Sequence, residues 1–567
     1  MAQGSHARKV LFAAGLAGAF AVVTGAASPQ ARACGCFTPP DPSVPVIQAG
    51  ERIAFAMKDG TVTAHIQIQY QGSASEFGWL LPLPSIPTME LGTDELFNQL
   101  TTTTQPKYRL VRKYEGNCGF GFGRGGTASG PVPASAAPGG AVGDASNNSV
   151  LVIQASIGPY DYAVLKADSK EPMLAWLADN HYFVPAGTDE TVGAYIRPGA
   201  FFLALKLQSG QSTGDLQPVV VKYESDLPMI PIVLTSVAAQ PHMGIQVWML
   251  GASRAIPRNY FHTIINDLQI DWWTAGANYN DVVINAVGEA DKKHSYVTEY
   301  AGTSQVMKQV LNPPGRFGDL TELAAQPDVF SFTEYMWSHN FPRTSQVFSI
   351  LGRAVPYPPA LEKMGIPPSA FYQQLRYMLG QFMTMNPQAF AGWPGVTYMP
   401  DQLVKDLTDR VVKPTLEAGA MFDDNSYLTR LYTTLSPEDM TLDPVFSFNP
   451  DLPDVGNVHE ATLTYYCGYM QQQNDPSTTP ARLVTEQGWS RDFPNGTGVQ
   501  NPPLITGAAY SRQIQVLRES GGPVIVADHP PSDGCACAVN AGDGYRGAAV
   551  LMALLGAVLA LRPRRRR

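Results

Sequence analysis

The fold class that the sequence predicts is α+β, with a strand-rich mixed sheet in the N-terminal half and a more helical C-terminal half. Three observations predict it. Up to about residue 303, apolar and polar residues alternate with the period of two that marks half-buried strands. Between about 304 and 440, apolar residues recur with helical spacing. The 567 residues also exceed what one small core can organise, so two or three subdomains are expected.

The pattern divides the chain into seven consecutive segments. They are a signal peptide (1–33), a strand-rich N-terminal part (34–117), a flexible loop rich in Gly, Ala and Pro (118–149), a mixed α+β part (150–303), a mainly helical part (304–440), proline-rich loops with closing strands (441–532), and a tail with a cysteine motif, a short transmembrane segment and an arginine cluster (533–567).

Individual elements follow from local patterns. Residues 61–70 alternate cleanly and predict a strand after the Asp59-Gly60 turn, with His65 on its polar face and therefore exposed to solvent. Thr93 is expected to cap a helix over 93–100. An amphipathic helix is predicted over 401–418, a further helix over 425–435 and a strand over 230–239.

The two ends of the chain carry the signals of an exported protein. Arg8 and Lys9 precede an apolar run, and Ala31-Arg32-Ala33 predicts cleavage between Ala33 and Cys34. At the other end an apolar run over 548–561 is shorter than the roughly 20 residues of a full membrane span. It is framed by Cys535 and Cys537 before it and by four final arginines after it, namely Arg564, Arg565, Arg566 and Arg567. A membrane-associated protein of the cell envelope or outer surface is expected.

The charge of the body excludes nucleic acid as a partner. The first 33 residues hold three basic residues, and residues 541–567 hold six arginines and one aspartate. Of the 39 basic and 48 acidic residues, 30 and 47 therefore remain for the body, a net charge of −17. Phosphate binding needs a basic surface, which this body lacks.

Cysteine usage predicts disulfides, because an exported protein meets an oxidising compartment. The candidates are Cys34, Cys36, Cys118 and Cys467, and their three complete pairings are not distinguishable from sequence. A four-sulfur metal site built from the C-x-C pairs at the two ends is the less favoured interpretation.

The sequence contains no P-loop, H-E-x-x-H, G-x-S-x-G or EF-hand pattern, so no catalytic, cofactor-binding or metal residue is assigned and the question of an enzyme stays open. Gly121–Gly126 match G-x-G-x-x-G, but no helix follows to receive a phosphate. An enzyme would need a pocket where carboxylates or a histidine converge. The candidates are Asp443 or Asp451 with His262 or Glu299, and His262 with Asp267 or Asp271.

Three weaker patterns were weighed against structural roles. The acidic run Asp423-Asp424-Asn425 would suit calcium, the one cofactor that this chain suggests, although a helix cap explains it better. Trp272 and Trp273 would suit a sugar platform, but buried tryptophan is commoner. Glu334 and His339 lie five apart and do not share a helix face well.

Several stretches together resemble the uncharacterised bacterial family known as domain of unknown function 2330. They lie at residues 33–37, 77–84, 158–162, 298–302 and 427–432, and the likeness extends from about 33 to about 470. The tail, Gly-Cys-x-Cys followed by an apolar helix and polyarginine, resembles Myxococcus-type (MYXO-CTERM) C-terminal sorting tails. The family resemblance implies an exported envelope protein without an assigned reaction. The tail resemblance implies a sorting protease as partner and cleavage near Cys535 and Cys537.

The function expected from these observations is that of an exported cell-envelope protein with a binding or structural role, anchored or sorted at the surface. Its expected partners are the membrane, through the tail, a sorting protease and an envelope ligand or protein. The alternative is an envelope hydrolase that acts on peptide or glycan, and converging ionisable groups in one cleft would favour it.

Overall fold

The computed structural model describes residues 36–37, 47–71, 78–116, 150–180, 182, 189–208, 216–237, 239–468, 478–496, 498–500, 502, 505 and 507–530. The predicted signal peptide (1–33), the predicted loop (118–149) and the predicted tail (533–567) lie outside these residues. The expectations for Ala33, Cys34, Cys118, Gly121–Gly126, Cys535, Cys537 and the terminal arginines therefore stay predictions.

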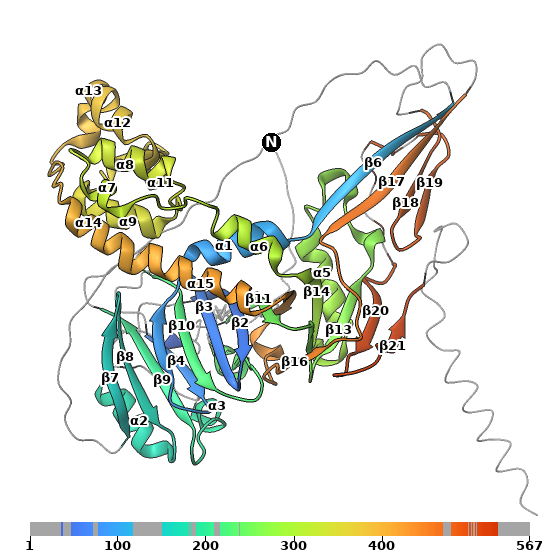
Figure 1. The fold of residues 1–567 in the computed structure, drawn as a ribbon. Helices are drawn as coiled ribbons and strands as arrows, with labels where there is room; N and C mark the ends of the chain where they lie inside the picture. The colour runs from blue at the N-terminus through green and yellow to red at the C-terminus, as the bar shows by residue number, and fades with distance from the viewer. Residues whose placement is uncertain are drawn as a thin grey trace, which may run out of the picture.

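A mixed sheet of ten strands forms the body, in the order β21-β20-β13-β14-β15-β11-β2-β3-β10-β5 (Figure 1). Most neighbours are antiparallel, but β11 pairs with β2 and β13 with β14 in parallel. The strands are β2 (Ile47–Lys58), β3 (Thr61–Gln71), β5 (Thr88–Leu91), β10 (Val219–Glu224), β11 (Ala239–Gly251), β13 (Phe261–Ile265), β14 (Ser295–Thr303), β15 (Tyr427–Leu435), β20 (Ser511–Val516) and β21 (Val524–Asp528).

A second, antiparallel sheet packs against one face of the first and forms a sandwich with it. Its order is β1-β4-β9-β8-β7. Its strands are β1 (Cys36–Phe37), β4 (Gly78–Leu83), β7 (Leu151–Ile157), β8 (Tyr160–Lys166) and β9 (Phe201–Leu207). Residues such as Leu203 and Leu205 meet Ile53 and Val247 of the large sheet in one apolar core. The helices α2 (Lys170–Asp179) and α3 (Asp189–Gly193) flank this sheet (Figure 1). The short helix α4 (Ile232–Thr235) contributes Leu234 to the apolar core between this sheet and α2.

Three helices cover the opposite face of the large sheet. They are α1 (Asp94–Thr104), α6 (Gln305–Leu311) and α15 (Lys413–Asp424) (Figure 1). Thr93 caps α1 as predicted, because its hydroxyl accepts a hydrogen bond from the backbone N–H of Glu95. Phe97 and Leu100 then pack on Trp248 of β11. Since both faces are covered, the central strands are buried on both sides.

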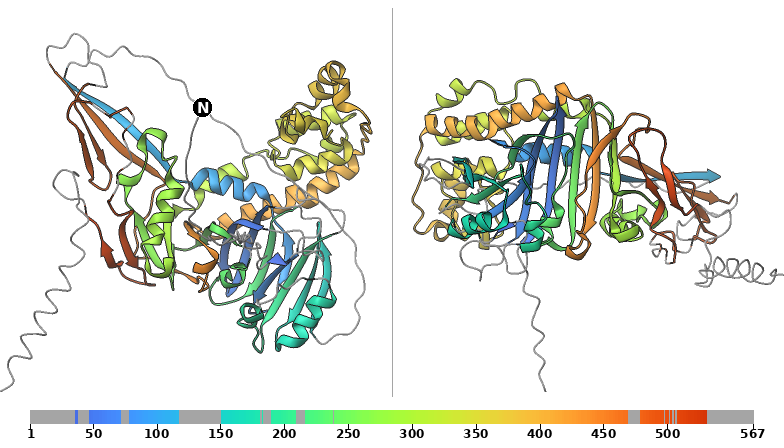
Figure 2. Two further views of the ribbon diagram at one scale, coloured as in Figure 1. Left: turned by 180° about the vertical axis from the view of Figure 1, so that it is seen from behind. Right: turned by 90° about the horizontal axis from the view of Figure 1, so that it is seen from below.

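A helical lobe with its own apolar core stands beside the sandwich (Figure 2). It comprises α7 (Leu320–Ala324), α8 (Val329–Ser338), α9 (Ser345–Ala354), α10 (Ala360–Lys363), α11 (Pro368–Gln373), α12 (Leu375–Tyr377), α13 (Met383–Met385) and α14 (Pro400–Leu407). The amphipathic helix predicted over 401–418 is observed as α14 and α15, joined by a π-helical turn at Thr408–Val412.

A four-stranded sheet projects from the other end of the body as an arm. Its order is β19-β18-β17-β6, with β6 (Lys107–Gly116) parallel to β17 (Val458–Cys467), beside β18 (Ala481–Thr485) and β19 (Ser490–Phe493). At its base lies α5 (Tyr279–Gly288). The short pair β12 (Arg254–Pro257) and β16 (Phe446–Asn449) packs through β12 against β11, β13, β14 and β15 of the large sheet. The arm is thus made from segments about 350 residues apart in sequence.

Three local predictions were wrong. His65 is buried, with 4% of its surface exposed, because the helix layer covers the face that the alternation assigned to solvent. Residues 425–435 form strand β15 instead of a helix, because they pair with both β11 and β14. Within 230–239 the chain forms the short helix α4. Tertiary pairing and burial override local propensity at these places.

Among the described residues, the helices are all too short or too polar to cross a bilayer.

Candidate functional site

A cavity of about 360 Å³ lies where the arm, the β12 loop and the edge of the large sheet meet. We call it the junction cavity. Its walls are largely apolar and include Ile264, Val297, Leu452 and Leu517. Its polar side chains come from distant segments of the chain and include Arg254, His262, Asp267, Tyr279, Thr298, Glu299, His459, Glu486, Gln487 and Gln515. An apolar cavity of this size with convergent polar groups is typical of a small-molecule site.

A directed chain of hydrogen bonds lines the cavity. Gln515 donates through Nε2 to Gln513 Oε1 (2.7 Å), so its own Oε1 faces Nδ1 of His262 (3.1 Å). An amide oxygen only accepts, and Nδ1 therefore carries the imidazole proton. Nε2 of His262 then accepts from the hydroxyl of Thr298 (2.9 Å), and that hydroxyl oxygen accepts from Nη2 of Arg254 (3.2 Å).

Thr298, His262 and Gln515 are arranged like the nucleophile, the base and the orienting group of a catalytic triad. The charges and the burial around them nevertheless oppose nucleophilic catalysis. Burial and the charge of Arg254 lower the pKa of His262 to about 3. The imidazole is therefore neutral at physiological pH and a weak base. A catalytic histidine gains a proton in the transition state and needs a carboxylate to stabilise it. Here the orienting partner is the neutral amide of Gln515, and a guanidinium lies beside the hydroxyl.

Glu299 is placed by a bulge in β14. The pairing of β14 with β15 shifts between Thr298 and Tyr300, so Glu299 is the extra residue. Its carboxylate accepts from Nε of Arg430, from Nε2 of Gln246 (3.2 Å) and from the hydroxyl of Tyr279 (2.6 Å). Burial, with the charge of Glu299 second, raises the pKa of Tyr279 well above its usual value. Glu299 is thus a fully bonded, buried anion whose charge Arg430 balances.

A second, more polar cavity of about 460 Å³ adjoins the first and is called the outer cleft. It shares Pro106, Tyr279 and Glu299 with the junction cavity. The Tyr279–Glu299 pair therefore forms part of the wall of both.

Arg254 is the polar group of the junction cavity whose charge is least compensated. Its side chain is buried, with 6% of the residue exposed, and Nη1 donates to the carbonyl of Pro453 (2.9 Å). Nε has no hydrogen-bond partner, and within the described part of the chain Arg254 forms no ion pair. Asp454 interacts electrostatically with Arg254 but forms no ion pair with it. Its carboxylate instead accepts a hydrogen bond from the hydroxyl of Tyr427 (2.5 Å). Burial accordingly lowers the pKa of Arg254.

The other carboxylates that line the junction cavity are already bonded. Asp267 accepts from the hydroxyl of Thr485 (2.8 Å) and the backbone N–H of Gln487 (3.0 Å), while burial raises its pKa to about 6. Glu486 lies at the exposed edge, 3.3 Å from the ring of His459. Neither approaches the guanidinium of Arg254 closely enough for an ion pair.

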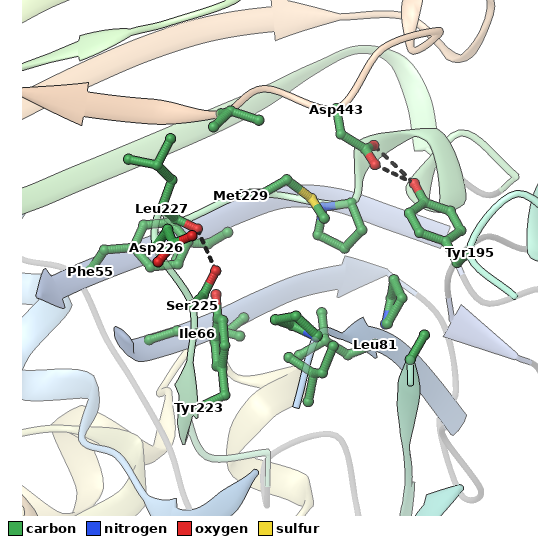
Figure 3. A pocket seen from close by; sticks show the side chains of 18 of the residues that line it. Phe55, Ile66, Leu81, Tyr195, Tyr223, Ser225, Asp226, Leu227, Met229 and Asp443 are labelled. Carbon is green, nitrogen blue, oxygen red and sulfur yellow. Dashed lines mark hydrogen bonds between the residues drawn. The ribbon is translucent and has the colours of Figure 1, made fainter. Parts of the chain in front are cut away.

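Of the residues nominated from sequence, the structure brings His262, Asp267 and Glu299 to this one cavity. Asp443 and Asp451 lie elsewhere. Asp443 accepts from the hydroxyl of Tyr195 at 2.7 and 2.9 Å in a different cavity (Figure 3). Asp451 accepts from the backbone N–H of Gly521 (2.7 Å).

The expected general-base pair of His262 with Asp267 or Asp271 is not formed. His262 bonds Thr298 and Gln515, and the side chain of Asp271 caps the following turn by accepting from the backbone of Trp273 and Thr274.

The remaining candidates have structural roles. Trp272 is buried and Trp273 donates to the carbonyl of Val499 (2.6 Å), so neither presents an open platform. Glu334 pairs with Arg376, and Asp423 and Asp424 pair with lysines. Among the described residues, the acidic, histidine and cysteine side chains form no cluster suited to a metal ion.

Of the four candidate disulfide cysteines, Cys467 ends β17 and pairs in register with Gly116 at the end of β6. Cys118 follows Gly116 by two residues but, like Cys34, lies outside the described part. The pairing stays a prediction.

Sequence reasoning missed Arg254, Thr298, Arg430 and Gln515. No motif joins them, because they come from four separate strands: β14, β15 and β20 of the large sheet, and β12 of the short pair that packs against β14 and β15. The one local signal was the presence of a charged residue, Arg430, within the otherwise uncharged run 427–435, which indicates that the Arg430 side chain has a polar partner.

The comparisons with known proteins give one match. Residues 28–347, more than half of the chain, match the family model described as an uncharacterized protein conserved in bacteria (DUF2330). The match ends before β15, so it covers Arg254, His262 and Glu299 but not Arg430. Neither a curated protein nor a solved structure matches the chain. The chain belongs to the DUF2330 family of uncharacterised bacterial proteins.

Proposed function

We propose that this protein is exported to the cell envelope and binds there a small organic carboxylate in the junction cavity. The ligand would carry one carboxylate on an apolar body. The observation that carries the binding proposal is the buried guanidinium of Arg254, which lines an apolar cavity of about 360 Å³ with Nε unbonded.

A ligand carboxylate would balance the buried positive charge of Arg254. A buried cation is unfavourable unless an anion pairs with it. Arg430 has such a partner in Glu299, whereas Arg254 has none among the described residues. A ligand carboxylate would supply the missing charge through the planar geometry that guanidinium groups favour. The apolar walls around Leu452 and Leu517 would then cover the rest of the ligand.

The experiment compares phenylacetate with phenylacetamide by titration calorimetry. The two probes share shape and differ in charge. We expect phenylacetate to bind about 10- to 100-fold more tightly, which corresponds to the roughly 1.5–3 kcal/mol of a charge-assisted hydrogen bond. Arg254→Met should remove this preference, while Arg109→Met, on the exposed face of the arm, should keep it.

A second variant shows whether a loss of binding in Arg254→Met reflects the lost guanidinium or a misfolded protein. Arg254→Lys keeps the charge but loses the planar fork, so it should retain part of the preference for phenylacetate. Equal binding of the two probes by the unmodified protein, or an unchanged preference in a folded Arg254→Met protein, would contradict the proposal.

Support for export comes from the sequence. A basic start, an apolar run and the Ala31-Arg32-Ala33 motif make a secretory signal. The Cys535 and Cys537 motif, apolar run and terminal arginines make an anchoring or sorting tail. The acidic body and the open cleft beside the junction cavity are compatible with ligand capture outside the cytoplasm.

A hydrolase is the second candidate, and the 2.9 Å contact between Thr298 and His262 is the observation that favours it. It predicts that an activated ester such as p-nitrophenyl acetate leaves an acyl group on Thr298, detectable as a mass increase on that peptide, and that Thr298→Ala abolishes turnover. The low basicity of His262 predicts neither adduct nor turnover dependent on Thr298.

A further inference from the structure

A separate cavity of about 530 Å³ lies between the two sheets of the sandwich (Figure 3). Its walls come from β2, β3 and β4 and from the loops after α3 and β10. Most of its lining is apolar, including Phe55, Ile66, Leu81, Leu227 and Met229. Sandwich cores rarely leave voids larger than a water molecule, whereas ligand pockets reach this volume. We call it the inter-sheet cavity.

One ionisable group of this cavity, Glu51, has a buried oxygen without a hydrogen-bond partner among the described residues. Glu51 lies on β2 in the middle of the ten-stranded sheet, and 4% of its surface is exposed. Its Oε2 has no hydrogen-bond partner within the described part of the chain. Burial raises the pKa of Glu51 to about 7. The nearby hydroxyl of Tyr296, whose pKa is raised by burial first and by the charges of Tyr260 and Glu51 second, is also unbonded.

The other polar groups of the cavity are bonded or lie at its edge. Asp443 already accepts from the hydroxyl of Tyr195 and from the backbone N–H of Val233 (2.9 Å). Arg258 pairs with Glu519 at 3.4 Å, and Asp226 is exposed. Glu51 is therefore the group inside the cavity that needs a donor from outside the chain.

We propose that the inter-sheet cavity binds an aliphatic amine, whose ammonium group donates to the carboxylate of Glu51 while its alkyl chain lies among the apolar walls. An amine suits this position better than an alcohol, because it balances the charge as well as the hydrogen bond. An aliphatic chain suits the lining, because contact with side chains such as Leu81, Leu227 and Met229 needs no fixed hydrogen-bond geometry.

The site is independent of the carboxylate site proposed above. Glu51 lines the inter-sheet cavity and the outer cleft but not the junction cavity. The two ligands also have opposite charge, so one probe set distinguishes the two proposals.

The test uses octylamine, octanol and octanoate on the full chain by titration calorimetry. We expect octylamine to bind most tightly, and each methylene added from hexylamine to octylamine to raise affinity about three- to fourfold. Glu51→Gln should remove the preference for the amine over the alcohol. Glu90→Gln, which changes a half-buried carboxylate paired with Lys222 on the same sheet, should leave it unchanged.

Two further measurements make the proposal falsifiable. Leu227→Trp, a substitution in a half-buried loop residue at the cavity wall, should weaken all three probes by filling the volume. Octylamine affinity should rise as the pH passes from 6 to 8, because Glu51 ionises in that range. Equal affinity for octylamine and octanol, failure of all three probes to bind, or an unchanged amine preference in a folded Glu51→Gln protein would overturn it.

Discussion

Glu51 on β2, Arg254 on β12 and Glu299 on β14 are three buried ionisable side chains, and their hydrogen-bonding surroundings differ. Glu299 has a guanidinium and two neutral donors. Arg254 and Glu51 each face a cavity with a polar atom unbonded. A satisfied buried pair stabilises one conformation, whereas an unsatisfied group beside a void indicates a missing partner. The sites proposed here follow from that difference.

Glu51 should make stability fall with rising pH. Its folded pKa of about 7 lies above the ordinary value of 4.5, so between these values the unfolded chain ionises first. Stability is then highest below pH 4.5 and is lost as pH rises toward 8, by about 3 kcal/mol for this one group. The melting temperature of the Glu51→Gln protein should therefore increase relative to that of the unmodified protein as pH rises from 5 to 8. A constant difference across that range would show that Glu51 is not a buried acid.

At the scale of elements, sequence patterns predicted what depends on neighbouring residues. The cap of α1 at Thr93 and the helix over 401–418 were predicted, because capping and amphipathic spacing are local. Strand β15 was missed because its two partners, β11 and β14, lie more than 120 residues away. His65 was predicted to be exposed but is buried, for the same reason: the helices α1 and α15, which lie elsewhere in the sequence, cover its face of the sheet.

The cap of α1 gives a test at this scale. Thr93 is fully buried, accepts from the backbone N–H of Glu95 (3.2 Å) and lies 3.3 Å from the hydroxyl of Thr415 on α15. Thr93→Ala should lower the free energy of unfolding by about 1–2 kcal/mol, because both contacts are lost. Thr93→Ser keeps the hydroxyl and should lose less. Equal denaturation midpoints for the three proteins would mean that the cap does not stabilise the helix layer.

At the scale of the whole molecule, the body is a sandwich between a helical lobe and a strand arm (Figure 2). The junction cavity was only half visible from sequence. His262 and Glu299 were nominated because histidine and glutamate carry chemistry, but Arg254 and Gln515 enter the site only when the sheet order is known. The match to the family model likewise gives membership without a reaction, so the function rests on the cavity itself.

Export belongs to this scale as well. The intact mass of the protein recovered from its native envelope should correspond to a chain that begins at Cys34 and ends near Cys535 or Cys537. A form that begins at Cys34 and still carries Arg567 would show that the tail is a plain membrane anchor. A form that retains Met1 and Arg567 in the cytoplasmic fraction would contradict export.

The most direct test of the central claim is a crystal structure of the full chain soaked with 4-bromophenylacetate. The anomalous signal of bromine locates the ligand without bias from the surrounding density. We expect one bromine among the apolar walls of the junction cavity near Leu452 and Leu517, with the carboxylate within hydrogen-bond distance of the guanidinium of Arg254. A saturating soak that leaves this cavity empty, or that places the carboxylate away from Arg254, would contradict it.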